Sequence, residues 1–125
     1  MGDGPRAPFF ALVDTGADDS KMTFSQAERL GVVLDRTQPI LFESATGSAI
    51  GYFGEVTLEL RQSPVSYVWK AQVSFLPTPK TTSSEEEAKV VLGHTSFFRY
   101  FSVSFDFQRR RLKLRPNRLF VGRPR

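Results

Sequence analysis

The stretch FFALVDTGADDS, residues 9–20, decides the fold and indicates the chemistry of this chain. Its first five residues are all apolar, which is typical of a buried strand. They lead directly into Asp14, which opens a polar turn containing Gly16. A carboxylate at the end of a buried strand is costly unless a nearby group compensates for its lost hydration. The stretch therefore predicts a buried strand ending on a functional carboxylate, whose partner the rest of the protein must supply.

The remaining sequence is dominated by strand patterns. Apolar residues alternate over residues 56–60, 67–75 and 101–115, and the last range predicts a C-terminal hairpin with one apolar face. Val90-Val91-Leu92-Gly93 predicts a second short buried strand ending on glycine. The glycine-rich segment 43–54 predicts an exposed hairpin, and short strands are expected at 32–34 and 40–42 around a turn at 35–39.

Helical signals are few. Ser25 and Glu28 have the spacing of a capping box and Gly31 is a stop signal, so a short helix is expected over residues 24–30. Residues 94–100 predict at most a helical turn, because their aromatic residues are poor helix formers. The pattern as a whole predicts a mostly β fold, a small closed or sandwich-like barrel with one or two short helices.

Length and charge suggest one domain with two extensions. The 125 residues suffice for a single core, with a flexible leader at 1–8, a folded domain at 9–115 and a disordered basic tail at 116–125. The first 107 residues hold 9 basic and 13 acidic residues, a net charge of −4, whereas the last 18 hold eight basic residues and no acid. The excess positive charge therefore lies at the C-terminal end.

Composition also limits the chemistry. The absence of Cys excludes disulfides and a cysteine nucleophile, and a lone His94 leaves no histidine cluster, so neither metal nor cofactor is expected. No segment has the length of a membrane span or the pattern of a signal peptide, so we expect a cytoplasmic protein without a membrane partner.

The sequence VDTGADDS at residues 13–20 resembles the active-site loop of the retropepsin-like (retroviral-type) aspartic proteases, in their cellular and bacterial single-domain form. Val91-Leu92-Gly93 resembles the downstream signature of that family. The glycine-rich hairpin, the two long strands and the short helix after the second signature follow in the same order. The resemblance covers nearly all of residues 9–114 and implies an acid-protease-like barrel with one half of an active site per chain.

The resemblance implies a homodimeric endopeptidase acting on peptide or protein substrates. Asp14 would be the catalytic carboxylate, with Thr15 and Gly16 supporting the active-site loop. Since like charges about 3 Å apart cannot both ionise, two Asp14 residues would share one proton and activate a water between them. The residues that would bind substrate come from the loop, the hairpin tip and the second signature: Ala17, Asp18, Asp19, Thr46, Gly47, Ser48 and Leu92.

Two departures from the retroviral pattern lead to further hypotheses. His94 stands where those enzymes have an arginine that pairs with the acid at the Asp18 position, so a charged His94 would pair with Asp18 and make the dimer pH-sensitive. A structural role for His94 is favoured over that of a catalytic base. Because only 13 residues precede Asp14, the C-terminal hairpin 101–115 is expected to supply the dimer interface.

Two alternative functions stay open. The fold can persist in an inactive dimerisation or peptide-binding module. The basic residues of 109–125 could instead indicate a nucleic-acid-associated protein. Specific nucleic-acid recognition is not expected, because Phe120 is the only aromatic residue among these cations.

Overall fold

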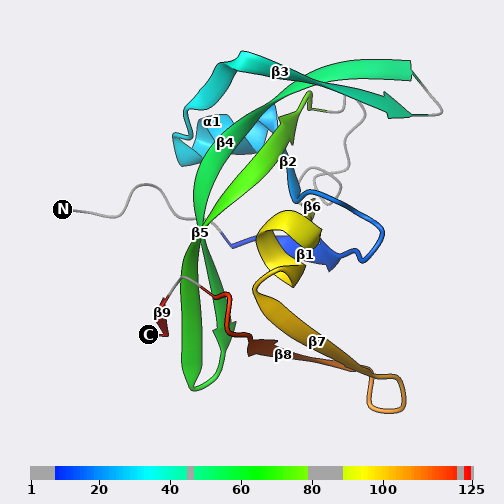
Figure 1. Ribbon diagram of the computed structural model, residues 1–125, viewed down its shortest axis with the longest axis vertical. Coiled ribbons are helices and arrows are strands. Elements are labelled where there is room, and N and C mark those ends of the chain that lie inside the picture. The colour runs from blue at the N-terminus through cyan, green and yellow to red at the C-terminus, as the bar shows by residue number, and fades with distance from the viewer. Residues whose placement is uncertain (1–7, 45–46, 79–88, 121–122, 125) are drawn as a thin grey trace.

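The computed structural model describes residues 8–44, 47–78, 89–120 and 123–124. These residues form a mostly β fold with two short helices, which confirms the coarse prediction of fold class. The elements follow one another along the chain as shown in Figure 1: β1 (Phe10–Val13), β2 (Lys21–Thr23), α1 (Phe24–Leu30), β3 (Leu34–Ser44), β4 (Gly47–Gln62), β5 (Val65–Leu76), β6 (Lys89–Leu92), the π-helical turn η1 (His94–Phe98), β7 (Phe101–Asp106), β8 (Arg111–Pro116) and β9 (Arg123–Pro124).

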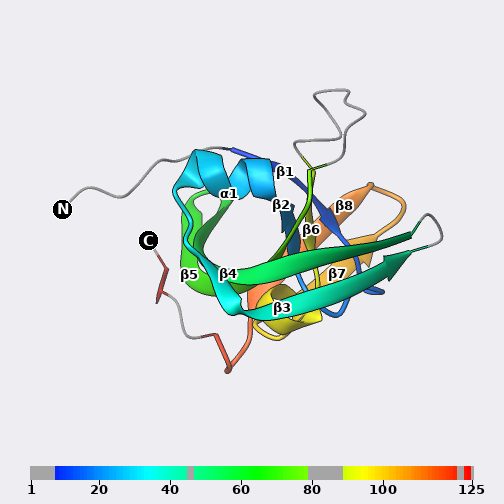
Figure 2. The same ribbon diagram turned by 90° about the horizontal axis from the view of Figure 1, so that it is seen from above.

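The main sheet is strongly curved but open. Its strands lie in the order β1-β6-β2-β5-β4-β3, and β9 pairs with β5 beside this path. The end strands β1 and β3 do not pair with each other in the described residues, so the expected closed barrel is not confirmed. Figure 2 shows the sheet curling round on itself, with α1 over one side. The hairpin β7-β8 forms a second, two-stranded sheet.

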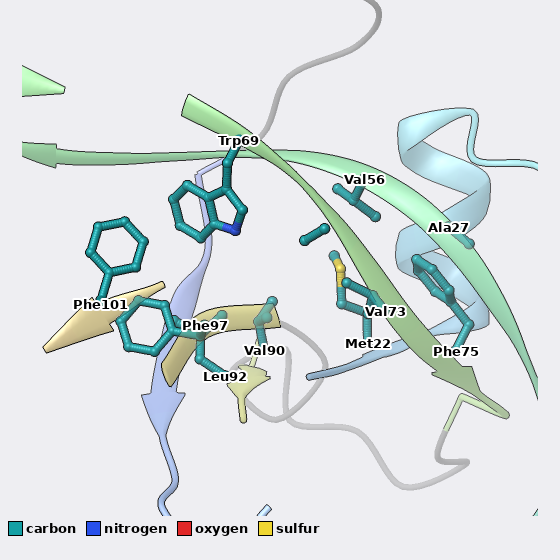
Figure 3. Close-up of a cluster of buried hydrophobic side chains, with 11 residues drawn as sticks. Met22, Ala27, Val56, Trp69, Val73, Phe75, Val90, Leu92, Phe97 and Phe101 are labelled. Atoms are coloured by element: carbon teal, nitrogen blue, oxygen red, sulfur yellow. The ribbon is translucent and has the colours of Figure 1, made fainter. Parts of the chain in front are cut away.

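The core is built on β5. Its alternation places Trp69, Val73 and Phe75 on the inner side, where all three are almost completely buried, as the two-residue period predicts. Side chains from β2, β6 and η1 meet them in one cluster (Figure 3). The indole Nε1 of Trp69 donates to the carbonyl oxygen of Ser96 at 2.9 Å, so its polar group is satisfied inside the core.

Helix α1 occurs where it was predicted, but a different residue caps it. Thr23 is the N-cap: its hydroxyl accepts from the N–H of Gln26 at 3.2 Å, and the Gln26 side chain accepts from the N–H of Thr23 at 2.9 Å. The helix ends at Gly31, whose φ of 70° is the left-handed conformation that glycine favours. Within the part of the chain that the structure describes, no helix is long and apolar enough to cross a membrane.

The two short strands expected around a turn at 35–39 are one strand. β3 pairs with β4 on both sides of an irregularity between Asp35 and Ile40. Asp35 bends the strand locally, because its carboxylate accepts hydrogen bonds from the hydroxyl and the N–H of Thr37. These bonds, the hydroxyl first, lower the pKa of Asp35 below its usual value. The turn-forming residues 35–39 therefore produce an irregularity within β3, and the strand continues beyond them.

The C-terminal residues differ from the disordered tail that was expected at 116–125. Pro116 closes β8, and Asn117 donates through its N–H to the carbonyl oxygen of Tyr100 at 2.9 Å. The ring of Phe120 packs against Phe101, with the ring centres 5.2 Å apart, and also contacts Tyr67 and Trp69. An aromatic side chain on the core explains why this segment folds. Most of the leader expected at 1–8 lies outside the described residues.

Candidate active site

Asp14 follows β1 directly and begins a tight turn. The parallel pairing of β1 with β6 sets Val13 opposite Leu92, and the N–H of Asp14 continues the ladder by donating to the Leu92 carbonyl at 3.0 Å. The Asp14 carbonyl oxygen then accepts from the N–H of Ala17 at 3.1 Å. Its carboxylate oxygen Oδ1 accepts from the N–H of Gly16 at 2.9 Å. The carboxylate is therefore oriented by its own turn.

The loop that follows Asp14 lies against the segment after β6, and main-chain bonds join the two. The N–H of His94 donates to the Ala17 carbonyl and that of Thr95 to the Asp18 carbonyl, both at 2.9 Å. Their approach requires glycine at position 93. A Cβ there would lie 2.5 Å from the Asp19 oxygen and 2.6 Å from the Ala17 oxygen. The two predicted signatures thus meet in one structural unit.

Buried hydroxyl groups reinforce this unit. Ser20 and Ser96 are both buried, and the Ser96 hydroxyl donates to the Ser20 hydroxyl oxygen at 2.6 Å. Ser20 also accepts from the N–H of Gly93 at 3.0 Å, and its carbonyl accepts from the N–H of Ser74 on β5 at 2.9 Å. Buried polar groups of this kind stabilise a single arrangement when every partner is satisfied. The network therefore fixes the Asp14 loop to the core.

The two acidic residues after Ala17 have different surroundings. The Asp19 carboxylate accepts from the Thr95 hydroxyl at 3.1 Å and lies 3.5 Å from the Ser74 hydroxyl. The Asp18 side chain is exposed, and among the described residues it forms no ion pair. No group of three or more His, Asp or Glu side chains in the described part of the chain is arranged as a metal site. Asp18 is thus the acidic side chain of this loop that is open to a ligand.

His94 has a different partner from the one expected. Its Nε2 hydrogen-bonds the carbonyl oxygen of Thr15 rather than pairing with Asp18. Since a carbonyl only accepts, Nε2 must carry the hydrogen, which is possible for both the neutral and the charged ring. The ring also lies against Phe98, with the centres 5.2 Å apart. His94 therefore holds the Asp-Thr-Gly turn through both its main chain and its side chain.

The predicted burial of the first strand is wrong for a single chain. Phe10 is 85% exposed and Leu12 is 55% exposed, while Asp14 itself is half-buried. β1 is also an edge strand, because it pairs only with β6 in the described residues. Apolar edge strands of this kind are normally covered. Phe10 and Leu12 therefore form exposed apolar surface in the strand that leads into Asp14.

The hairpin formed by β3 and β4 extends over the side of the molecule from which the Asp14 loop projects (Figures 1 and 2). Gly47 begins β4 with a φ of 138°, and Ser48 pairs with Glu43 across the hairpin; both residues are exposed. Thr46, also predicted to bind substrate, lies outside the described residues. The hairpin therefore lies on the same side of the molecule as the Asp14 loop.

An apolar groove lies beside Val13, the residue that precedes Asp14. Val13 lines it together with Phe105, Phe107 and Leu112 from the C-terminal hairpin, and the remaining lining residues are Asp106, Arg110 and Arg111. Phe105 is 66% exposed and Phe107 is 96% exposed. Exposed apolar surface beside a candidate site is typical of an interaction surface.

The structure brings together most of the predicted loop residues but changes one role. Leu92 was predicted to bind substrate, whereas its side chain is buried in the core and its carbonyl holds Asp14. Sequence reasoning missed Ser20, Thr95 and Ser96 as the residues that fasten the loop. Their only sequence signal is that small hydroxyl residues follow each signature closely.

Comparisons with family models, with curated proteins and with solved structures find no match to this chain.

Proposed function

We propose that this chain is one subunit of a homodimeric, retropepsin-like aspartic endopeptidase that hydrolyses peptide bonds. The observation that carries the proposal is the fixed position of Asp14: its main chain is held by β6 and its carboxylate by the N–H of Gly16. A catalytic group has to be held in a defined orientation by surrounding hydrogen bonds. Asp14 has such support, even though it lies at the end of an edge strand.

The proposed chemistry requires a second carboxylate. Two carboxylates that share one proton can divide the work, one acting as base toward water and the other donating to the substrate carbonyl. Asp19 is engaged by Thr95, and Asp18 lies on the far side of Ala17 in the same loop. Neither repeats the structural position of Asp14. The second carboxylate is therefore Asp14 of another copy, related by a twofold axis.

The apolar surfaces beside Asp14 are the proposed interface. The groove is lined by Val13, the residue before Asp14, and by Phe105, Phe107 and Leu112. A second copy placed there would cover these side chains while bringing the two Asp14 residues together. The C-terminal hairpin would then supply much of the interface. In this arrangement the open sheet of each subunit forms half of an acid-protease-like molecule.

The reaction that we propose is direct attack by water. One Asp14 carboxylate removes a proton from the water while the water oxygen bonds to the peptide carbonyl carbon. The other Asp14, which is protonated, donates its proton to the carbonyl oxygen. The carboxyl group that took the water proton then gives it to the nitrogen, and the carbon–nitrogen bond breaks to release the amine. The other Asp14 carboxylate takes a hydroxyl proton as the carbonyl re-forms, which restores the shared proton. The β3-β4 hairpin would exclude bulk water from the bound peptide. Because one proton must be shared, activity should have a bell-shaped, acidic to mildly acidic pH dependence.

The test is cleavage of a diverse peptide pool between pH 3 and 8, followed by mass spectrometry. Wild type should cleave, and Asp14→Asn should lose cleavage entirely. The matched control is Glu28→Gln, which makes the same charge change at an exposed residue of α1 and should cleave like wild type. Cleavage that survives in Asp14→Asn would contradict the proposal. Absence of cleavage by a wild-type dimer would instead favour a peptide-binding module.

A further inference from the structure

The hairpin β7-β8 has a polar face opposite its apolar one, because alternate residues of a strand point to opposite sides. Three cross-strand pairs make up this face: Ser102 with Arg115, Ser104 with Lys113 and Asp106 with Arg111. We call these six residues the basic face. All except Asp106 are exposed. Asp106 and Arg111 also line the groove beside Val13, whereas Ser102, Ser104, Lys113 and Arg115 lie outside it and are not used by the proposed catalytic site.

The positive charge on the basic face is largely uncompensated. Asp106 is its one acid, and the carboxylate lies 3.9 Å from the guanidinium of Arg109 in the hairpin turn. Lys113 and Arg115 form no ion pair with another described residue. Both come from the end of the chain that holds eight basic residues and no acid from Gln108 onward. These cations are therefore available to a negatively charged partner.

The arrangement of the cations is regular. Lys113 and Arg115 are alternate residues of β8, so they stand roughly 7 Å apart on the same side of the hairpin. Each faces a serine of β7 whose hydroxyl makes no hydrogen bond to another described residue. A cation beside a free hydroxyl is a combination that binds phosphate oxygens, through charge and through a donated hydrogen bond.

We propose that the basic face binds a single-stranded nucleic acid through its phosphates. The face has no apolar or aromatic side chain, whereas a protein partner needs an apolar centre and a membrane surface needs apolar side chains that insert. For the same reason it has no platform on which bases stack, so binding is independent of sequence. The face is only two strands wide, about 5 Å between strands, which suits one phosphate backbone rather than the two of a duplex.

The experiment measures fluorescence anisotropy of a labelled 20-nucleotide oligothymidylate between 50 and 200 mM NaCl. The test variant carries Lys113→Gln and Arg115→Gln. The matched control carries Arg29→Gln and Lys70→Gln, which removes one Arg and one Lys from exposed positions on α1 and β5. Each phosphate contact to a single strand contributes about −0.7 to the slope of log affinity against log salt. The test variant should therefore bind with a slope about 1.4 shallower than wild type, and the control should keep the wild-type slope.

A second variant keeps the test independent of the number of cations. Ser104→Glu places a carboxylate opposite Lys113 and should weaken oligothymidylate binding at least as much as the loss of that lysine. The proposal is overturned if wild type does not bind at 50 mM NaCl, or if the control variant loses as much affinity as the test variant. It is also overturned if polyglutamate of equal charge competes as well as unlabelled oligothymidylate, since the partner would then be an acidic protein segment.

Discussion

His94 holds Thr15: the imidazole Nε2 hydrogen-bonds the Thr15 carbonyl, while the His94 main chain bonds Ala17 two residues further on. His94, the first residue of η1, therefore hydrogen-bonds the main chain both within the Asp-Thr-Gly turn, at Thr15, and just after it, at Ala17. The expected ion pair with Asp18 would have tied dimer strength to the charge of His94. The observed bond to a carbonyl can persist with either form of the ring, provided that Nε2 keeps its hydrogen.

Replacement of His94 should therefore affect turnover more than substrate affinity. An exposed hydrogen bond contributes about 1 kcal/mol, so His94→Ala should lower kcat roughly fivefold through a looser turn while KM changes little. Steady-state kinetics on a peptide cleaved by wild type would measure both constants. Phe98→Leu, which removes the ring that lies against His94 but keeps the hydrogen bond of His94, serves as the control and should have a smaller effect. Full kcat in His94→Ala would contradict a positioning role.

The buried pair Ser20 and Ser96 should contribute strongly to stability. Removal of the Ser20 hydroxyl leaves the Gly93 N–H and the Ser96 hydroxyl without their acceptor. A buried group left unsatisfied costs about 1–3 kcal/mol, so Ser20→Ala should lower the free energy of unfolding by that amount. Urea denaturation followed by circular dichroism measures it. Ser48→Ala, at an exposed position of β4, should change stability by no more than about 0.5 kcal/mol. Equal stability of the two variants would argue against the network.

Gly93 and Gly16 should respond to alanine in different ways. At Gly93 the added Cβ meets the carbonyl oxygens of Ala17 and Asp19, which belong to main chain and cannot move aside, so Gly93→Ala should lose more than about 2 kcal/mol of stability. At Gly16 the Cβ would lie 3.2 Å from the Asp14 carboxylate. Gly16→Ala should therefore remain folded and lose activity. Thermal unfolding and peptide cleavage, measured on both variants, separate the two effects, and an active, fully stable Gly93→Ala would refute the packing argument.

The groove beside Val13 predicts which residues control dimerisation. Phe105→Ser and Phe107→Ser each remove an apolar side chain that a second copy would bury, a loss of about 1.5–3 kcal/mol per subunit. The dimer dissociation constant should rise at least tenfold in each variant, measured by sedimentation velocity over a range of concentrations. Val33→Ser, at a site that is 87% exposed and outside the groove, is the control. If all three variants dimerise alike, the interface lies elsewhere.

Local features could be predicted from the sequence where the residue type at a position is compatible with a single structural role. Gly31 ended α1 as expected, because its left-handed φ favours glycine, and the alternation of Trp69, Val73 and Phe75 identified the core side of β5. The predicted N-cap was wrong because two pairs of residues fit the capping-box pattern. Thr23 with Gln26 has the same capping spacing as Ser25 with Glu28, and the structure uses the first pair, while Ser25 hydrogen-bonds Thr78.

Other features depend on contacts between residues distant in the sequence, so they could not be predicted from short stretches of it. The apolar run at residues 9–13 indicates burial, but a single chain leaves Phe10 exposed because β1 is an edge strand. Phe120 looked like part of a basic tail until its contact with Phe101 was known. The partner of His94 likewise followed from the meeting of two loops 79 residues apart in sequence.

The central claim is that two Asp14 residues share one active site, and subunit mixing tests it most directly. Wild type is mixed with Asp14→Asn at a constant total concentration, allowed to exchange subunits, and assayed on a cleavable peptide. When half of the subunits are mutant, random pairing leaves about one quarter of the dimers fully wild type, so activity should fall to about one quarter of its initial value. Activity that falls only to about one half would mean that each subunit acts alone, which would contradict the shared site.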